Sequence, residues 1–296
     1  MSETVRSRKL PATSRQAQLT TRRGGGWLAL VLKQVVLLLI AILSIYPLYY
    51  MAVTAFKTPD TWLHNQFGLP IPFTMQNISQ ALDQGRLLVW FRNSVTVTIS
   101  AILISTVVSA LAAYALARMR FRGRDTYLNS MIILMVIPPA VIILPLFVLM
   151  VQIDLINTLQ GLVLIYVGML IPFSIYLLVS FFRGLPSELF DAAAIDGCSN
   201  FGTLWRIVVP LSSPAFVTLI VVNALWVWNE LLIALVFLQS EELKTLMPGL
   251  TLFRGHFQVN EPLIMAGTLI ATLPMVILYL FGQRFFIEGL VAGAVK

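Results

Sequence analysis

Residues 191–210 read DAAAIDGCSNFGTLWRIVVP and form a polar interruption between two long apolar stretches of the chain. A helix is expected to begin at Pro186, because proline fits the first helical position and Glu188 and Asp191 then lie at the positive amino end. Gly197 is expected to end this helix, since glycine permits a sharp turn. The three alanines between these points have short side chains, so the backbone of another protein can approach this side of the helix closely.

A second helix is expected to follow, with Ser199 as its cap and Pro210 as its end. Apolar residues recur along it at three- or four-residue spacing, namely Phe201, Leu204 and Ile207 or Val208. One side of this helix can therefore pack against the rest of the protein, while the alanine side of the first helix faces outward. Residues 186–210 are predicted to form a helix-turn-helix.

The composition of the whole chain indicates a membrane protein. Of its 296 residues, 58% are hydrophobic and only 11% are charged, and the mean hydropathy is +0.86. A bilayer core about 30 Å thick needs about 20 apolar residues per helix. Windows of that kind lie at about residues 28–56, 93–117, 127–151, 162–182, 215–238 and 263–285. The sequence therefore predicts an all-α membrane protein with six transmembrane helices.

Lysine and arginine residues predict the orientation of these spans. Fourteen of them flank the same side of the membrane as the amino-terminal segment, five lie in the loops of the opposite side, and Lys33 lies within the first span. Because cytoplasmic loops carry the excess of positive charge, both termini and residues 186–210 are predicted to be cytoplasmic. The loops at 57–92 and 239–262 are predicted to be external.

The chain is predicted to consist of two parts. Residues 1–26 are polar and basic and end in three glycines, which is typical of a flexible cytoplasmic tail, and residues 27–296 form the transmembrane domain. The net charge of +7 is spread over membrane-flanking loops, so membrane topology and anionic lipid explain it better than a nucleic-acid partner does. With one cysteine and two histidines, no metal site is expected.

The spacing within residues 191–210 resembles the EAA motif, with which the permeases of ABC importers dock their ATPase. Three residues separate Ala193 from Gly197, nine separate Gly197 from Ile207, and a proline lies two residues after Val208. Two positions depart from the usual pattern: Asp191 replaces a glutamate and Val209 replaces a leucine. Both changes keep the charge or the apolar character.

Other segments are similar to the MalG-like permeases of carbohydrate ABC importers. They are YPLY at 46–49, AFKTP at 55–59, NS at 93–94, AAYALAR at 112–118, IPP at 137–139, WVWNE at 226–230 and QRFFIEGLVAGAVK at 283–296. The closing segment is the most specific of these, because it distinguishes this kind of permease from its usual partner permease.

The resemblance implies a type I ABC importer (MetI-like) permease fold with a cytoplasmic coupling helix-turn-helix, in a prokaryotic cell membrane. The implied partners are a second permease, two ATPase subunits and an extracytoplasmic sugar-binding protein. The chain itself is then not an enzyme and holds no cofactor, since Mg-ATP is bound by the ATPase. The implied docking residues are Glu188, Asp191, Ala192, Ala193, Asp196, Gly197 and Phe201, and residues 289–296 are a second candidate contact with the ATPase.

Two further groups are candidates for binding. Trp226, Trp228, Asn229 and Glu230 offer the aromatic face and hydrogen-bonding groups that suit a sugar, although tryptophans in such places also anchor spans or pack between helices. An outer loop matches in place the loop that family members insert into the cleft of the binding protein, and a solvated hairpin is the alternative. Its residues are Arg254, Gly255, His256, Phe257 and Gln258.

The alternative function is an ion-coupled membrane carrier or a membrane enzyme that works without an ATPase. Two observations disfavour it. Intramembrane charge is nearly absent, with Glu230 as the main candidate, whereas ion-coupled carriers usually keep several buried ionisable groups. The chain also lacks a Gly-x-x-x-x-Gly-Lys-Ser/Thr loop, so energy from ATP has to come from a partner.

Overall fold

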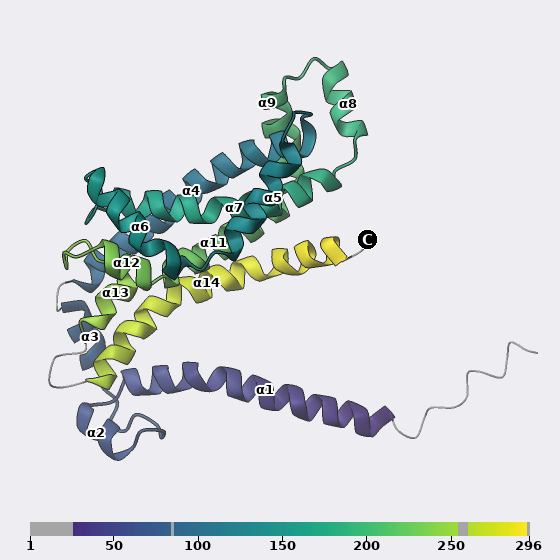
Figure 1. Ribbon diagram of the computed structural model, residues 1–296. Helices are drawn as coiled ribbons and strands as arrows, with labels where there is room; N and C mark the ends of the chain where they lie inside the picture. The colour runs from purple at the N-terminus through teal and green to yellow at the C-terminus, as the bar shows by residue number, and fades with distance from the viewer. Residues whose placement is uncertain (1–25, 84–85, 254–259, 295–296) are drawn as a thin grey trace, which may run out of the picture. The chain divides into compact units, whose positions relative to one another are not determined.

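The computed structural model describes residues 26–83, 86–253 and 260–294, and these ranges contain helices and loops but no strand (Figure 1). Four helices are long and apolar enough to cross a membrane: α1 (Gly26–Ala55), α4 (Leu87–Arg118), α7 (Leu159–Gly184) and α14 (Glu261–Ala294). The other helices are α2 (Pro59–His64), α3 (Gln76–Asp83), α5 (Arg124–Val136), α6 (Pro139–Gln152), α8 (Glu188–Ile195), α9 (Asn200–Thr203), the π-helical turn η1 (Leu204–Val208), α10 (Val209–Leu211), α11 (Ser213–Asn229), α12 (Leu232–Phe237) and α13 (Leu246–Thr251).

Two pairs of helices are apolar enough to span the membrane together but are sharply bent, which gives up to six spans in the part of the chain described. α5 and α6 meet at 102°, and Asn200–Leu211 meets α11 at 79°. The apolar window predicted at 127–151 is therefore a sharply bent pair of helices. Pro138 has no N–H group to continue α5, and it holds the preceding residue, Ile137, in an extended conformation with ψ of 118°.

The predicted span at 215–238 is also interrupted. α11 ends at Asn229, Glu230 is extended with ψ of 123°, and α12 then begins at Leu232. An average of hydropathy over the window does not detect this break, because the residues on both sides of it are apolar.

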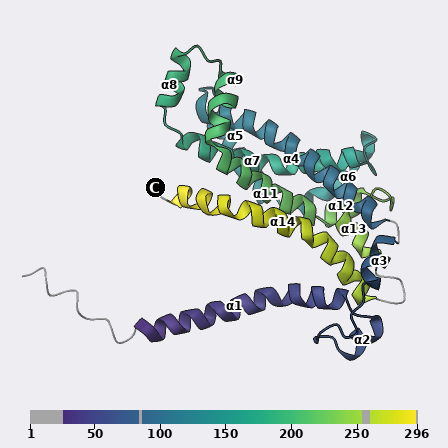
Figure 2. The ribbon, with the colours of Figure 1, turned by 180° about the vertical axis from the view of Figure 1, so that it is seen from behind.

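The chain divides into residues 1–50 and 51–296. In the first unit, the apolar side chains of α1 are exposed along the helix, as expected for a helix that faces lipid or another membrane protein. In the second unit, α4 and α7 form the most extensive helix pair, and α11 packs against α4, α7 and α14 (Figure 2). One buried cluster lies around Ile165 and Phe237, and another lies around Leu178 and Leu204.

One end of the second unit is organised by the first turns of α4. The Trp90 Nε1 donates to the carbonyl oxygen of Glu241 at 2.7 Å, and the Asn93 Nδ2 donates to that of Glu242 at 2.8 Å. The hydroxyl oxygen of Ser94 accepts from the backbone N–H of Leu246 at 2.7 Å. These bonds fix the loop before α13 to the start of α4, which explains structurally why Asn and Ser occur together at 93–94.

The connection from α1 to α3 is ordered around a buried lysine. The Lys57 ammonium donates to the carbonyl oxygens of Asn65 and Gln66 at 2.7 and 3.0 Å, and burial lowers its pKa. The Asn77 side chain donates in turn to the carbonyl oxygen of Lys57 at 2.6 Å. The loop predicted to be external at 57–92 therefore includes two short helices, α2 and α3, and it ends earlier than predicted, because α4 begins at Leu87.

Candidate functional site

Residues 186–210 form a hairpin of two helical arms at the opposite end of α4 from α3 and α13 (Figure 1). α8 begins after Ser187, whose carbonyl oxygen accepts from the backbone N–H groups of Phe190 and Asp191 at 2.9 and 3.1 Å. The turn after α8 contains Gly197 with φ of +73°, a left-handed conformation that costs any residue with a Cβ atom.

Two hydrogen bonds close this turn. The Gly197 N–H donates to the carbonyl oxygen of Ala194 at 3.1 Å, and the Cys198 N–H donates to that of Ala193 at 2.9 Å. Together they form a Schellman motif, which satisfies the last carbonyl groups of α8. The prediction that Gly197 ends the first helix is confirmed.

The second arm begins as predicted but extends past the predicted end. The Ser199 hydroxyl oxygen accepts from the backbone N–H of Gly202 at 3.1 Å, so Ser199 caps α9. The chain then continues through η1 into α10, and the helical path breaks at Ser212 rather than at Pro210. Pro210 is the second residue of α10, directly after the π-helical turn η1, so the helical path passes through it.

The packing of the second arm agrees only in part with the sequence pattern. Leu204 and Val208 are buried, as expected, but Phe201 is 65% exposed, and its ring meets that of Trp205 edge-to-face with 6.0 Å between ring centroids. The expectation that Phe201 packs against the bundle is therefore wrong. Phe201 lies in the first turn of the arm, next to the hairpin turn and beyond the end of the bundle, so its position along the arm decides its exposure.

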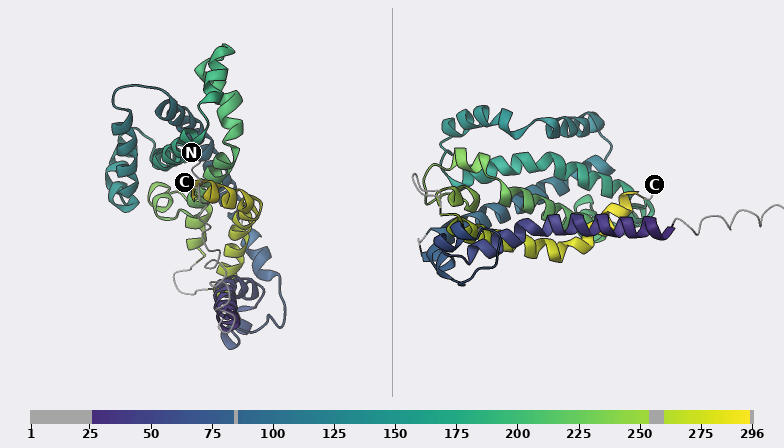
Figure 3. Two further views of the ribbon diagram at one scale, coloured as in Figure 1. Left: turned by 90° about the vertical axis from the view of Figure 1, so that its right-hand side faces the viewer. Right: turned by 90° about the horizontal axis from the view of Figure 1, so that it is seen from below.

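The hairpin projects from one end of the helices around it (Figure 3), and most of the predicted docking residues in it are exposed. Glu188, Asp191, Ala192, Asp196, Gly197 and Phe201 are exposed. Ala193 is the exception at 3% exposure, so the side that a partner can approach closely is formed by its neighbours Ala192 and Ala194. Ile195 is 86% exposed beside them, which adds an apolar contact to this surface.

Sequence analysis missed the side chains that attach the hairpin to the bundle. The guanidinium group of Arg118, at the end of α4, donates to the carbonyl oxygens of Phe182 and Leu185 and lies over the ring of Phe190 at 3.8 Å from its centroid. In the sequence, Arg118 is one basic residue among several after an apolar span and the last residue of the AAYALAR segment at 112–118. That signal indicates membrane orientation and does not reveal a particular contact.

The four residues predicted to contact a substrate are separated by the fold. Trp228 is 4% exposed, its Nε1 donates to the carbonyl oxygen of Ala271 at 3.0 Å, and its ring meets Phe91 edge-on. It therefore packs between α11 and its neighbours. Asn229 is exposed and its side chain donates to the carbonyl oxygen of Leu225 at 2.7 Å.

The Glu230 side chain caps the first turn of α12 from the position before the N-cap residue, Leu231. Its carboxylate oxygens accept from the backbone N–H groups of Ile233 and Ala234 at 2.8 and 2.9 Å and from the Tyr166 hydroxyl at 2.7 Å. Three donors thus compensate the charge at the break between α11 and α12. This arrangement gives Glu230 a structural role and leaves little of its carboxylate for a transported ion.

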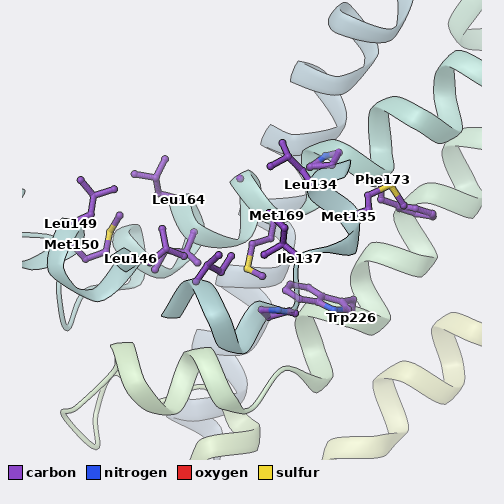
Figure 4. Close-up of a pocket in the computed structure, with 15 residues that line it drawn as sticks. Leu134, Met135, Ile137, Leu146, Leu149, Met150, Leu164, Met169, Phe173 and Trp226 are labelled. Atoms are coloured by element: carbon purple, nitrogen blue, oxygen red, sulfur yellow. The ribbon is translucent and has the colours of Figure 1, made fainter. Parts of the chain in front are cut away.

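Trp226 borders an apolar pocket of about 570 Å³ formed by α5, α6 and α7 around the break at Pro138 (Figure 4). Its ring also meets Tyr166 edge-on, at 5.6 Å between centroids. The wall consists of Leu134, Met135, Ile137, Pro139, Ile142, Leu146, Leu149, Met150, Leu164, Ile165, Gly168, Met169, Pro172, Phe173 and Trp226. Trp226 is the predicted substrate residue that lines the pocket (Figure 4). Its indole N–H is a hydrogen-bond donor, but the other side chains of the wall are apolar, so the pocket offers few of the hydrogen-bonding groups that a sugar needs.

The predicted contact residues 254–258 lie outside the residues that the structure describes. The same holds for the last two residues of the carboxyl-terminal segment, 295–296, while α14 continues to Ala294. Their predicted contacts with a binding protein and with an ATPase stay predictions.

Residues 105–288 match the model of a protein family described as "Binding-protein-dependent transport system inner membrane component". The matched range contains the hairpin, its Gly197 turn and both bent spans. The chain belongs to this family. It is therefore an inner-membrane permease subunit of an ABC transporter, and the six-helix MetI-like permease fold expected from the sequence is confirmed.

Curated relatives cover nearly the whole permease. It is 36% identical to the probable ABC transporter permease protein YurM of Bacillus subtilis over 88% of this chain and 87% of the relative. It is 33% identical to the arabinooligosaccharides transport system permease protein AraQ of Halalkalibacterium halodurans, over 87% and 93%. It is also 33% identical to the trehalose/maltose transport system permease protein MalG of Thermococcus litoralis, over 90% and 98%.

The fold of the permease is similar to that of a chain in the crystal structure of a bacterial ABC transporter involved in the import of the acidic polysaccharide alginate. The TM-score is 0.79 at 22% identity, and the match covers 90% of this chain and 98% of the other. The likeness to this chain supports the shared fold.

Proposed function

We propose that this permease carries a sugar or oligosaccharide into the cell. It would form the pathway with a second permease, receive the sugar from an extracytoplasmic binding protein, and be driven by two ATPase subunits that bind and hydrolyse Mg-ATP. Relatives named for arabinooligosaccharides and for trehalose and maltose support the substrate class. The observation that carries the proposal is the exposed hairpin with its Gly197 turn. Its exposed surface supports the part of the proposal in which another protein, the ATPase, binds this chain.

The proposed mechanism is mechanical. Closure of the ATPase dimer on ATP moves the hairpin. The hairpin in turn moves the membrane helices, so that access to the pathway switches between the outside and the inside of the cell. Such coupling requires the hairpin to bind the ATPase with different affinity in the two states. Asp191 and Asp196 offer exposed charges for this contact, and the backbone at Gly197 is open to a partner, since nothing lies within 4 Å of the position that a Cβ atom would take.

Co-purification of the permease with its ATPase tests the proposal. Gly197→Pro places a fixed φ of about −65° where the structure has +73°, and Asp191→Lys reverses an exposed charge, so we expect both variants to lose the ATPase while still inserting in the membrane.

Two matched controls distinguish docking from general damage. Gly123 also has a positive φ, +88°, with nothing within 4 Å of its Cβ position, and Asp60 in α2 is also an exposed aspartate. Gly123→Pro and Asp60→Lys are expected to keep the ATPase. Retention of the ATPase by Gly197→Pro and Asp191→Lys would refute docking through the hairpin.

A further inference from the structure

Arg118 contacts the end of α7, the link that follows it, and α8. One guanidinium nitrogen donates to the carbonyl oxygen of Phe182, in the last turn of α7, and to that of Leu185, in the link between the helices, at 2.7 Å. The same group lies 3.8 Å from the centroid of the Phe190 ring in α8. The Arg118 side chain therefore binds the end of α7 and the link through two charge-assisted hydrogen bonds, and α8 through a cation–π contact.

The second arm of the hairpin is attached to the same end of α4. Tyr114, one helical turn before Arg118, belongs to the same buried cluster as Leu204 and Val208 of the second arm. Tyr114 is 5% exposed, Leu204 is 1% exposed and Val208 is fully buried. The last turns of α4 therefore contact both arms, α8 through Arg118 and the second arm through the apolar packing around Tyr114.

The other end of α4 holds the loop that precedes α13. Arg86, immediately before α4, forms an ion pair with Glu241, and Trp90 and Asn93 donate to the backbone of the same loop at 2.7 and 2.8 Å. α4 is one helix of 32 residues without an internal proline. It therefore connects this loop to the hairpin as a continuous rod about 48 Å long, at 1.5 Å per residue (Figure 2).

We propose that Arg118 is a positioning residue that makes the hairpin move with α4, so that events at the loop before α13 reach the ATPase. The inference rests on the proposed function, because it assigns the two ends of α4 to the binding-protein side and the ATPase side. Docking itself depends on the exposed hairpin surface. Arg118 faces the bundle, and its removal is expected to leave that surface in place while the hairpin loses its fixed orientation to α4.

The first test measures coupling in the assembled transporter in lipid. ATP hydrolysis is compared with and without the binding protein for wild type, Arg118→Ala, Arg118→Lys and the control Arg120→Ala, an exposed arginine two residues later. We expect Arg118→Ala to keep its ATPase subunits and its basal rate, while stimulation by the binding protein falls by about fivefold or more. Arg118→Lys restores part of the stimulation because it keeps the charge, and Arg120→Ala behaves as wild type.

Phe190→Leu shows whether Arg118 acts through the hairpin. This change removes the ring but keeps an apolar side chain. We expect it to reduce stimulation in the wild type and to add no further loss in Arg118→Ala, because the two residues share one interaction. Independent, additive losses overturn the proposal, as does full stimulation in Arg118→Ala. Loss of the ATPase from Arg118→Ala also overturns it, because Arg118 is then a support of the docking surface.

A second measurement needs no partner protein. Cys198 is the single cysteine of the chain and lies in the hairpin turn, so a spin label attached there reports the mobility of the hairpin in the full chain in nanodiscs. We expect a more mobile spectrum in Arg118→Ala and wild-type spectra in Arg118→Lys and Arg120→Ala. Unchanged mobility in Arg118→Ala overturns the positioning role. A wild-type chain that fails to bind an ATPase overturns the proposed function instead, and the coupling role falls with it.

Discussion

Glu230 shows how a charged side chain in a predicted span can serve the fold. Its carboxylate accepts from Ile233 N–H, Ala234 N–H and the Tyr166 hydroxyl, so its removal leaves three donors unpaired in an apolar region. We predict that Glu230→Ala lowers the free energy of unfolding by about 1–3 kcal/mol. A lower thermal unfolding temperature of the purified permease in nanodiscs is the measurement.

Glu230→Gln distinguishes a structural carboxylate from an ion-coupling one. The amide keeps one acceptor oxygen, so we expect a smaller loss of stability than in Glu230→Ala, and transport is expected to continue. Tyr166→Phe is the matched control, because it removes a single donor from the same carboxylate. A stable Glu230→Gln protein that has lost all transport contradicts the structural role and favours the ion-coupled carrier.

The approach of α13 to α4 depends on a single glycine. A Cβ atom at Gly249 would lie 2.2 Å from Cδ2 of the buried Trp90 ring, so α13 or the ring has to move. We predict that Gly249→Ala destabilises the permease by about 1–3 kcal/mol, the usual cost of overpacking. Gly168, in α7, has nothing within 4 Å of its Cβ position, and Gly168→Ala is expected to be neutral or slightly stabilising through helix propensity. Thermal unfolding of the two variants side by side measures the difference, and equal stability contradicts this packing.

The sequence predicted the features that depend on neighbouring residues better than those that depend on contacts with distant parts of the chain. The Gly197 turn and the Ser199 cap depend on stereochemistry within a few residues, and both are confirmed. The windows at 93–117 and 162–182 lie inside α4 and α7. The break at Glu230 and the exposure of Phe201 depend on where the chain meets the rest of the bundle, so periodicity alone did not reveal them. Arg118 was missed for the same reason, since its contacts lie 64 and 67 residues away in the sequence.

The orientation of the whole molecule is a prediction from charge that one native residue can test. Fourteen lysines and arginines against five predict that both termini and the hairpin are cytoplasmic. Because Cys198 is the single cysteine and lies in the hairpin turn, a membrane-impermeant maleimide is expected to label it in inverted vesicles and not in intact cells. The experiment uses cells without the ATPase, so that a docked partner does not shield the thiol.

A cysteine at the other end of the bundle makes the orientation test two-sided. Glu242 is exposed in the loop before α13, and Glu242→Cys in a Cys198→Ser background is expected to show the opposite pattern, with labelling in intact cells. The two sites lie at opposite ends of α4, because Asn93 near its start binds the backbone of Glu242 and Arg118 at its end binds the link into the hairpin. Labelling of Cys198 from outside would put the hairpin on the side that has no ATP, and the permease would then need an energy source other than a cytoplasmic ATPase.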